Sequence, residues 1–137
     1  MRTLHVGLQV ADLARSLEFY RALGYEVVGA VPQTELGSLT MLQLPGDDVV
    51  AIELVHDRDT GTIDPRGISH LVVQVEHLVA MCARLAAEGV QPGPVSSPDG
   101  SGELLTAWLT DPDGYRIELV QWPRGHAVGL TRADFPG

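Results

Sequence analysis

The sequence predicts an α+β protein made of two tandem βαβββ modules. The first observation is an internal repeat, because the four residues Ile-Glu-Leu-Val at 52–55 recur at 117–120. The second is that the same shift aligns 4–10 with 69–75, so that His falls on His, Gln on Gln and Val on Val. The third is that each copy shows strand-like alternation, then helical spacing, then alternation again. These patterns describe one module that occurs twice.

The first module, residues 1–57, begins with a strand at 3–10, in which every second residue is apolar. Asp12 is a good N-cap for the helix that follows, and Gly24 is its expected C-cap. Alternation and turn residues then place strands at 25–31, 39–44 and 49–55, with a Pro-Gly-Asp-Asp turn at 45–48.

The second module, residues 67–122, repeats this order after a polar, turn-rich linker at 57–67. Its helix is expected from Leu78 to Gly89. The strands are expected at 68–75, near Val90, at 103–110 and at 115–120, with a flexible loop at 96–102 and a type I turn, Asp-Pro-Asp-Gly, at 111–114. Residues 123–137 lack periodicity and are expected to form a C-terminal tail on a surface or a partner subunit. The whole chain, 1–137, is interpreted as a single domain.

Composition and charge exclude several classes of protein. The chain has 18 acidic and 9 basic residues, a formal net charge of −9, and no basic cluster, so we expect neither nucleic acid nor a membrane as partner. No apolar run reaches the length of a membrane span, and Met1 leads into a strand without a signal peptide. The single cysteine, Cys82, cannot form an intrachain disulfide. We therefore expect a reducing, cytoplasmic location.

The repeat singles out four candidate metal ligands. His5 aligns with His70 on the first strand of each module, and Glu53 aligns with Glu118 on the last strand. Two imidazoles and two carboxylates form an octahedral set that leaves positions for water or substrate. A glutamate among large apolar neighbours also needs a partner, or a half-exposed edge, to make its charge tolerable.

Simpler interpretations exist for individual residues. Glu53 alone fits an edge-strand charge that prevents aggregation. The remaining histidines, which have no repeat partner, are expected at the surface: His56, His77 and His126. Cys82 lies on the apolar helix face and is expected to pack in the core rather than to act as a nucleophile. Trp108 fits either the core or the wall of a pocket.

The paired modules and their four ligand positions resemble the vicinal oxygen chelate superfamily over roughly 3–122. The ending Asp-Pro-Asp-Gly-Tyr-x-Ile-Glu-Leu most resembles the bacterial glyoxalase I (lactoylglutathione lyase) branch. This resemblance implies a cup-shaped mixed β-sheet with one divalent metal ion per site, which is Ni, Co, Zn, Mn or Fe. It also implies a homodimer in which His5 and Glu53 of one chain join His70 and Glu118 of the other, with a site inside one chain as the alternative.

The chemistry implied by the resemblance is isomerisation of a small-molecule substrate. A hemithioacetal of an α-oxoaldehyde such as methylglyoxal would become a thioester by proton transfer through a metal-chelated enediolate. Glu118 would be the catalytic base, with Glu53 as ligand and second base. His5 and His70 would bind the metal as neutral imidazoles.

The expected substrate-binding residues are Gln9, Gln74, Asp57 and Trp108. Gln9 and Gln74 share their strand faces with the two candidate histidine ligands. Glyoxalase I-like proteins that use glutathione place an Arg at the position of Gln9 and an Asn at that of Asp57. Asp57 would repel a substrate carboxylate by roughly 1.5–3 kcal/mol, so another thiol is a real alternative.

Two other classes remain open. One is another metalloenzyme of the superfamily, either an acyl-thioester epimerase or an extradiol-type dioxygenase, although the latter usually has a His/His/Glu site. The other is a metal-free binding protein like the bleomycin-resistance members, which generally lack the four ligands. Fold alone does not decide between them.

Overall fold

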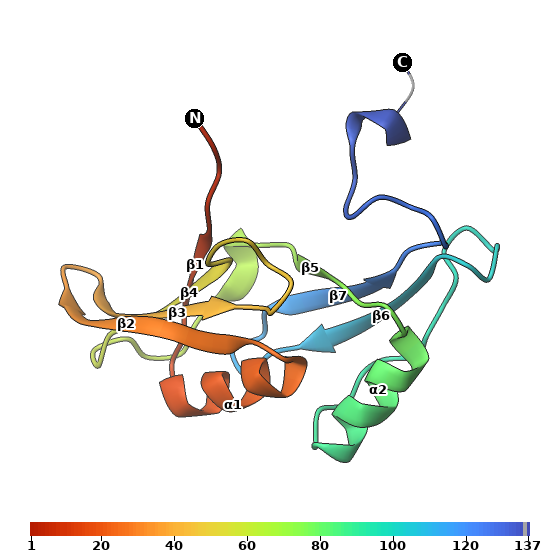
Figure 1. Ribbon diagram of the computed structural model, residues 1–137. Coiled ribbons are helices and arrows are strands. Elements are labelled where there is room, and N and C mark those ends of the chain that lie inside the picture. Colours follow the sequence, from red (N-terminus) through yellow and green to blue (C-terminus); the bar gives the residue numbers. More distant parts are fainter. Residues whose placement is uncertain (136) are drawn as a thin grey trace. The chain divides into compact units, whose positions relative to one another are not determined.

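The computed structural model describes residues 1–135 and 137 and confirms the α+β class (Figure 1). The regular elements are β1 (Val6–Gln9), α1 (Leu13–Leu23), β2 (Glu26–Thr34), β3 (Gly37–Gln43), β4 (Ile52–His56), β5 (Leu71–Gln74), α2 (Leu78–Ala87), β6 (Leu105–Thr110) and β7 (Arg116–Gln121). Single 3-10 turns occur at Pro65–Gly67 and Arg132–Asp134. Among the described residues, no helix has the length and apolar character that a membrane span requires.

The chain divides into two compact units. The first unit contains Met1–Ile68 together with Asp111–Tyr115, and the second contains Ser69–Thr110 and Arg116–Gly137. The first unit holds a four-stranded mixed sheet in the order β1-β4-β3-β2, and the second a three-stranded mixed sheet in the order β5-β7-β6. In each sheet the first strand of the module runs parallel to the last one.

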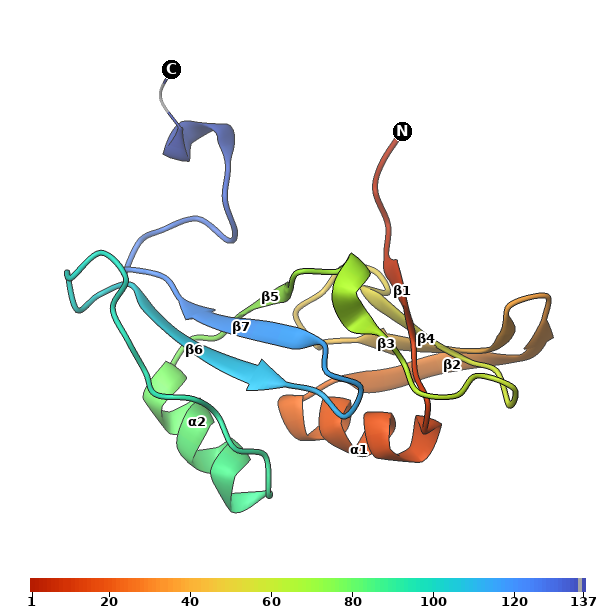
Figure 2. The same ribbon diagram turned by 180° about the vertical axis from the view of Figure 1, so that it is seen from behind.

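Helix α1 lies across one face of the first sheet (Figures 1 and 2). It begins as expected at Asp12, whose carboxylate accepts a hydrogen bond from the backbone N–H of Arg15 at 3.1 Å. It ends at Gly24, which has the left-handed φ of 113° that a glycine adopts without strain. The core of this unit is formed by buried side chains of the helix and of the strands, including Tyr20, Leu23, Leu8, Leu42 and Leu54. The opposite sheet face therefore remains open for polar groups.

The second unit has the same helix-on-sheet arrangement but lacks one expected strand. Leu78 and Leu85 of α2 are fully buried. The strand expected near Val90 does not form, because the Val90 N–H bonds to the Leu85 carbonyl at the end of the helix. Three prolines without N–H donors follow, at 92, 94 and 98. The segment still contacts β6 through a 2.8 Å hydrogen bond from the Gly93 N–H to the Trp108 carbonyl and through an isolated bridge between Ser96 and Thr106.

The Asp-Pro-Asp-Gly segment is a turn, as expected, with a 3.1 Å hydrogen bond from the Gly114 N–H to the Asp111 carbonyl. It also packs into the first unit, which the sequence did not indicate. The Asp113 carboxylate accepts hydrogen bonds from the backbone N–H of Ala11 and from the Ser16 hydroxyl. The Tyr115 hydroxyl donates to the carbonyl of Gln9 at 2.9 Å. The turn is thus part of the framework that holds the end of β1.

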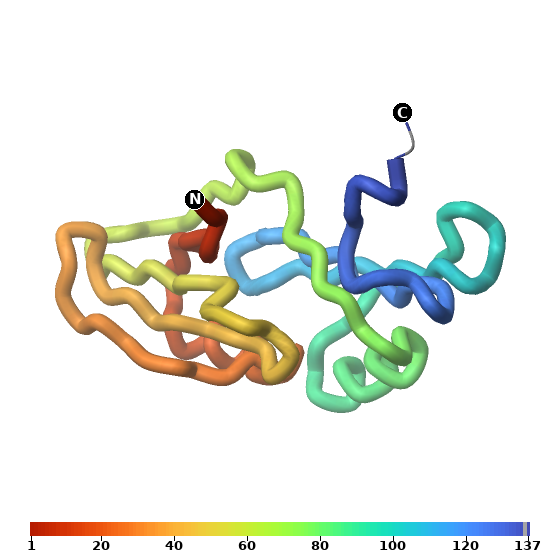
Figure 3. The backbone as a smooth tube through the Cα atoms, turned by 45° about the horizontal axis from the view of Figure 1, so that its top comes forward, coloured from red at the N-terminus to blue at the C-terminus, as the bar shows by residue number. Residues whose placement is uncertain are grey.

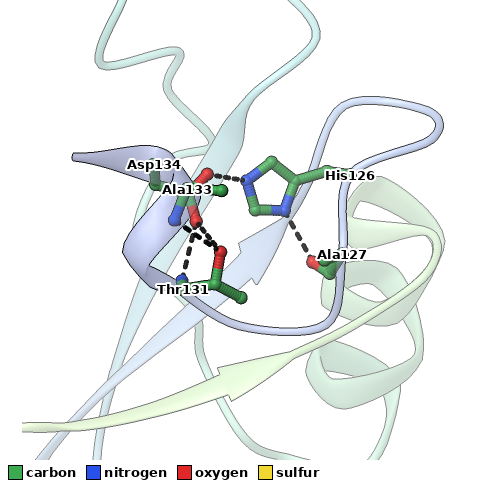
Figure 4. A network of polar contacts seen from close by, with 5 residues as sticks. All are labelled: His126, Ala127, Thr131, Ala133 and Asp134. Atoms are coloured by element: carbon green, nitrogen blue, oxygen red, sulfur yellow. Dashed lines mark hydrogen bonds and ion pairs between the residues drawn. The ribbon is translucent and has the colours of Figure 1, made fainter. Parts of the chain in front are cut away.

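The C-terminal tail has local structure of its own (Figure 4). The Asp134 carboxylate accepts from both the backbone N–H and the hydroxyl of Thr131, which closes a capping box around the last 3-10 turn. His126 contacts the carbonyl of Ala127 through Nδ1 and Asp134 through Nε2. Its ring stacks on Trp122, with 4.4 Å between the centroids. His126 was expected at the surface, and its side chain is 21% exposed, but it also forms the centre of a polar network.

Candidate metal centre

The first candidate pair lies on the open face of the first sheet. Residue Gly7 of β1 is opposite Glu53 of β4, and His5 lies two residues before Gly7 on the same face. His5 Nε2 donates a hydrogen bond to Glu53 Oε2 at 3.1 Å. Gly7 lies beside this pair, and a Cβ there would be in ordinary van der Waals contact with Glu53 Oε1 at 3.9 Å. The Glu53 side chain is only 13% exposed, so the carboxylate is mostly withdrawn from water.

The second candidate pair occupies the equivalent place in the second unit. Val72 of β5 is opposite Glu118 of β7, and His70 precedes Val72 by two residues. His70 Nε2 lies 3.6 Å from Glu118 Oε2. The Nδ1 atom of His70 is 2.9 Å from the Ser69 hydroxyl. A ring that binds a metal through Nε2 carries its proton on Nδ1, where the hydroxyl oxygen accepts it and fixes the ring orientation.

The donor distance in the first pair fits two neighbouring ligands of one ion, and the distance in the second pair is slightly longer. Donors bound at roughly 2.1 Å and at right angles lie about 3.0 Å apart, and a tetrahedral angle widens this to about 3.4 Å. The observed separations are 3.1 Å for His5–Glu53 and 3.6 Å for His70–Glu118. Imidazole nitrogen with carboxylate oxygen is also a donor combination typical of divalent transition metals. Each pair is therefore chemically suited to supply half of a metal centre.

The structure places the four expected ligands in two His–Glu pairs, with one pair in each unit. Within 1–135 and 137, no three His, Cys, Asp or Glu side chains gather closely enough to hold an ion. The histidine and glutamate of each module therefore lie side by side. A centre with all four ligands stays a prediction.

Three of the four expected substrate-binding residues lie near these pairs. Gln9 and Gln74 end β1 and β5, two strand positions beyond Gly7 and Val72, and both are exposed. Trp108 of β6 lies directly opposite Glu118, and its ring contacts His70 edge-on with 5.3 Å between the centroids. In the first sheet the residue opposite Glu53 is Met41. One pair therefore has an aromatic neighbour and the other a flexible aliphatic one.

Asp57 lies elsewhere, just beyond the end of β4. Its carboxylate accepts a hydrogen bond from the Asp59 N–H at 3.1 Å, which makes a tight turn. A shallow hollow is lined by 56–59 and by the β2–β3 hairpin, and Figure 3 shows that hairpin (orange) beside the segment after β4 (yellow-green). Its lining contains Arg58 between two aspartates, Asp57 and Asp59. The two carboxylates outnumber the guanidinium, so the hollow carries no excess of positive charge for a carboxylate.

Two side chains near the candidate ligands were not singled out from the sequence. Ser69 has Leu4 as its repeat equivalent, so the repeat gave no signal for it. Arg116 lies with its guanidinium carbon 4.2 Å from the centroid of the Trp108 ring, a contact that depends on the β6–β7 register. Cys82 is half-buried in α2, and burial raises the pKa of its thiol, which favours packing over nucleophilic chemistry.

Comparison with known proteins gives consistent matches. Residues 2–119 match the model of the Glyoxalase/Bleomycin resistance protein/Dioxygenase superfamily. A lactoylglutathione lyase of Neisseria meningitidis serogroup A is 33% identical over 130 residues, covering 91% of this chain and 94% of that protein. A glyoxalase/bleomycin resistance protein/dioxygenase domain from Frankia sp. EAN1pec superposes with a TM-score of 0.74 at 25% identity, covering 92% and 95% of the two chains. The trypanothione-dependent glyoxalase I of Leishmania major superposes with a TM-score of 0.69 at 30% identity, covering 88% and 86%.

Proposed function

The chain belongs to the Glyoxalase/Bleomycin resistance protein/Dioxygenase superfamily, and on that premise we propose that it is a metal-dependent lyase/isomerase of the glyoxalase I type. The observation that carries the proposal is the presence of two equivalent His–Glu pairs, His5 with Glu53 and His70 with Glu118, at ligand-like separations. Relatives at about one-third identity are named lactoylglutathione lyase, which supports the same assignment.

The two pairs would together hold one divalent ion, which is Ni, Co, Zn, Mn or Fe. Two neutral imidazoles and two carboxylates leave two octahedral positions free, and the two carboxylates balance the charge of the ion. We propose that the pairs meet in a homodimer, with the His5–Glu53 pair of one copy joining the His70–Glu118 pair of a second. Each unit supplies two neighbouring ligands, so neither pair alone would bind tightly.

The reaction would be a proton transfer between adjacent carbons of a hemithioacetal. A divalent ion bound by these ligands would act as a Lewis acid toward the two vicinal oxygens of the substrate. Glu118 would take the proton from the carbon that carries sulfur and return it to the neighbouring carbon, which yields the thioester. No atoms or electrons are gained or lost, so no second substrate is required. Glu53 would remain a ligand and serve as second base.

The remaining expected residues would position the substrate. Gln9 and Gln74 are exposed amides near the two pairs and can donate or accept hydrogen bonds. Trp108 would wall the second unit's half of the site. Neither Gln9 nor Asp57 offers a positive charge for a carboxylate of glutathione. This favours a second candidate function, that of a superfamily enzyme that moves a proton on another thiol adduct or on an acyl thioester.

The test begins with apoprotein reloaded separately with Ni, Co, Mn and Zn. We expect one ion per site by calorimetry, isomerisation of the methylglyoxal–glutathione hemithioacetal, and loss of turnover in Glu118→Gln. His70→Gln should weaken metal binding, whereas His77→Gln should not, because His77 lies in neither pair. Metal binding without turnover of this hemithioacetal would be consistent with the proposed metal-chelate chemistry and would exclude glutathione as the thiol. Failure to bind any of the four ions would contradict the proposal itself.

A further inference from the structure

Arg116 occupies a singular position in the second unit. It is the only arginine or lysine in the seven strands, β1 to β7. It begins β7 two residues before Glu118, so the two side chains share one face of the strand. Its guanidinium carbon lies 4.2 Å from the centroid of the Trp108 ring. A cation is therefore held on the face that carries the second His–Glu pair.

The stacked guanidinium keeps its hydrogen-bond donors available. A guanidinium over an aromatic ring is attracted by the ring quadrupole, and its N–H groups point outward in the guanidinium plane. Within the described part of the chain, Arg116 makes no hydrogen bond or ion pair, although acidic residues outnumber basic ones two to one. The ring contact restricts the side chain in advance, so less rotamer entropy is lost when an anion binds.

Trp108 connects this cation to the candidate ligand His70. The same indole that lies under Arg116 contacts the His70 ring edge-on, with 5.3 Å between the centroids. Two consecutive ring contacts place Arg116 within the length of a small organic molecule from the metal-binding nitrogen of His70. A ligand whose oxygens lie at that nitrogen could therefore extend along Trp108 to the guanidinium.

The repeat-related half in the first unit has no such cation. Ala51 stands at the repeat position of Arg116, and Met41 lies opposite Glu53 where Trp108 lies opposite Glu118. The hollow beside Asp57 contains Arg58, but two aspartates, Asp57 and Asp59, line it as well. The two halves therefore differ, because a cation on the face of the His–Glu pair occurs only in the second of these two sheets.

We propose that Arg116 determines specificity by binding a carboxylate of the substrate, so that the substrate is a vicinal-oxygen compound with a carboxylate a few bonds from the chelating oxygens. This inference rests on the proposed function. A carboxylate fits better than a phosphate dianion because one guanidinium balances a single negative charge, and the chain as a whole has a net charge of −9. Trp108 acts as the positioning residue that holds the guanidinium over the face.

The test compares two non-reactive chelators on metal-loaded protein. Acetohydroxamic acid offers two vicinal oxygens only, whereas the monohydroxamate of succinic acid offers the same oxygens and a carboxylate. A charge-assisted hydrogen bond corresponds to about tenfold or more in affinity, so we expect the carboxylate-bearing compound to bind at least about tenfold tighter by calorimetry. Arg116→Gln should remove this preference and Arg116→Lys should keep part of it. Arg124→Gln, which changes an exposed arginine of the tail, should leave it intact.

The outcomes separate this inference from the proposed function. Equal affinity for the two hydroxamates in the unmodified protein overturns the proposed role of Arg116 but not the proposed function. A preference that persists in Arg116→Gln does the same. The guanidinium would then only pack on the Trp108 ring. Failure of both hydroxamates to bind protein that demonstrably holds its metal overturns the chelate chemistry and, with it, this inference.

Discussion

The hydroxyl of Tyr20 donates a 2.7 Å hydrogen bond to Asp111 Oδ2, across 91 positions in the chain. Both side chains are buried, and the other carboxylate oxygen of Asp111 accepts from the backbone N–H groups of Asp113 and Tyr115. This contact fixes the turn after β6 to helix α1 within the first unit. Glu118 follows that turn by only three residues beyond Tyr115, so the contact anchors the chain just before a candidate ligand.

Tyr20→Phe should destabilise the fold by about 1–3 kcal/mol, because Asp111 Oδ2 loses its hydrogen bond while it stays buried. Denaturant unfolding monitored by circular dichroism measures the change. Tyr25→Phe is the matched control, since Tyr25 is also buried but its hydroxyl makes no hydrogen bond within the described residues. A Tyr20→Phe protein as stable as Tyr25→Phe would show that the turn is anchored by other contacts.

The stability of the unmodified protein relative to Asp111→Asn should fall as pH rises. Burial raises the pKa of the Asp111 carboxyl, and the hydrogen bonds from Tyr20, Tyr115 and Asp113 oppose this without cancelling it. A folded pKa above the unfolded one means that the protonated carboxyl stabilises the fold fully at pH below about 3.9, the unfolded value. That contribution is lost as pH rises through the folded pKa. Paired melting curves across this acidic range should show the gap changing in this direction, and a constant gap would contradict it.

The sequence predicted the local elements well because their signals are local. Asp12 and Gly24 marked the ends of α1 through capping and a left-handed turn, and the structure confirms both. The repeat also identified which histidine and glutamate share a face in each module, because parallel pairing of first and last strands places Gly7 opposite Glu53 and Val72 opposite Glu118.

The missed features depend on contacts between distant segments. The docking of Asp111 on Tyr20 has no local signature, and the Arg116–Trp108 stack requires the β6–β7 register. The false strand near Val90 arose from copying the first module onto the second, where three prolines remove the N–H donors that pairing needs. The alternation of side chains along a strand indicates which candidate ligands share a face of the sheet. It does not predict whether the four of them assemble into one metal centre.

Gly37→Ala should destabilise the β2–β3 hairpin by at least about 1 kcal/mol and deform the hollow beside Asp57. Gly37 has a φ of 110°, and a Cβ there would clash with the backbone carbonyl of His56. Chemical denaturation measures the loss, with Gly29→Ala in the neighbouring strand as control because a Cβ at Gly29 meets nothing within 4 Å. Equal stability of the two variants would contradict this reading of the hairpin.

Removal of metal by EDTA should lower the melting temperature of protein that carries its ion. A ligand at 100 times its Kd stabilises the native state by about 2.7 kcal/mol, and this contribution disappears with the ion. Glu53→Gln, which weakens one carboxylate ligand, should show a smaller shift, whereas Glu88→Gln at the exposed C-cap of α2 should respond like the unmodified protein. An EDTA response that is unchanged in Glu53→Gln would remove that residue from the ligand set.

The tail network is built around the ring of His126. Nδ1 faces the carbonyl of Ala127 at 2.6 Å and Nε2 faces Asp134 Oδ1 at 2.9 Å. Both partners are hydrogen-bond acceptors, so the two contacts hold the ring in place between Ala127 and Asp134. Hydrogen bonding from the Thr131 N–H lowers the pKa of Asp134, and His126 adds to this, so the carboxylate stays ionised in mildly acidic solution.

Removal of the imidazole should therefore loosen the tail and change the emission of Trp122, which stacks on His126. The chain has two tryptophans, so a Trp108→Phe background isolates the signal of Trp122. In this background we expect His126→Gln to change the emission of Trp122, because the indole loses the ring that stacks on it. His77→Gln is the control and should leave the emission unchanged. Unchanged emission in His126→Gln would contradict a role of the His126 contacts in ordering the tail.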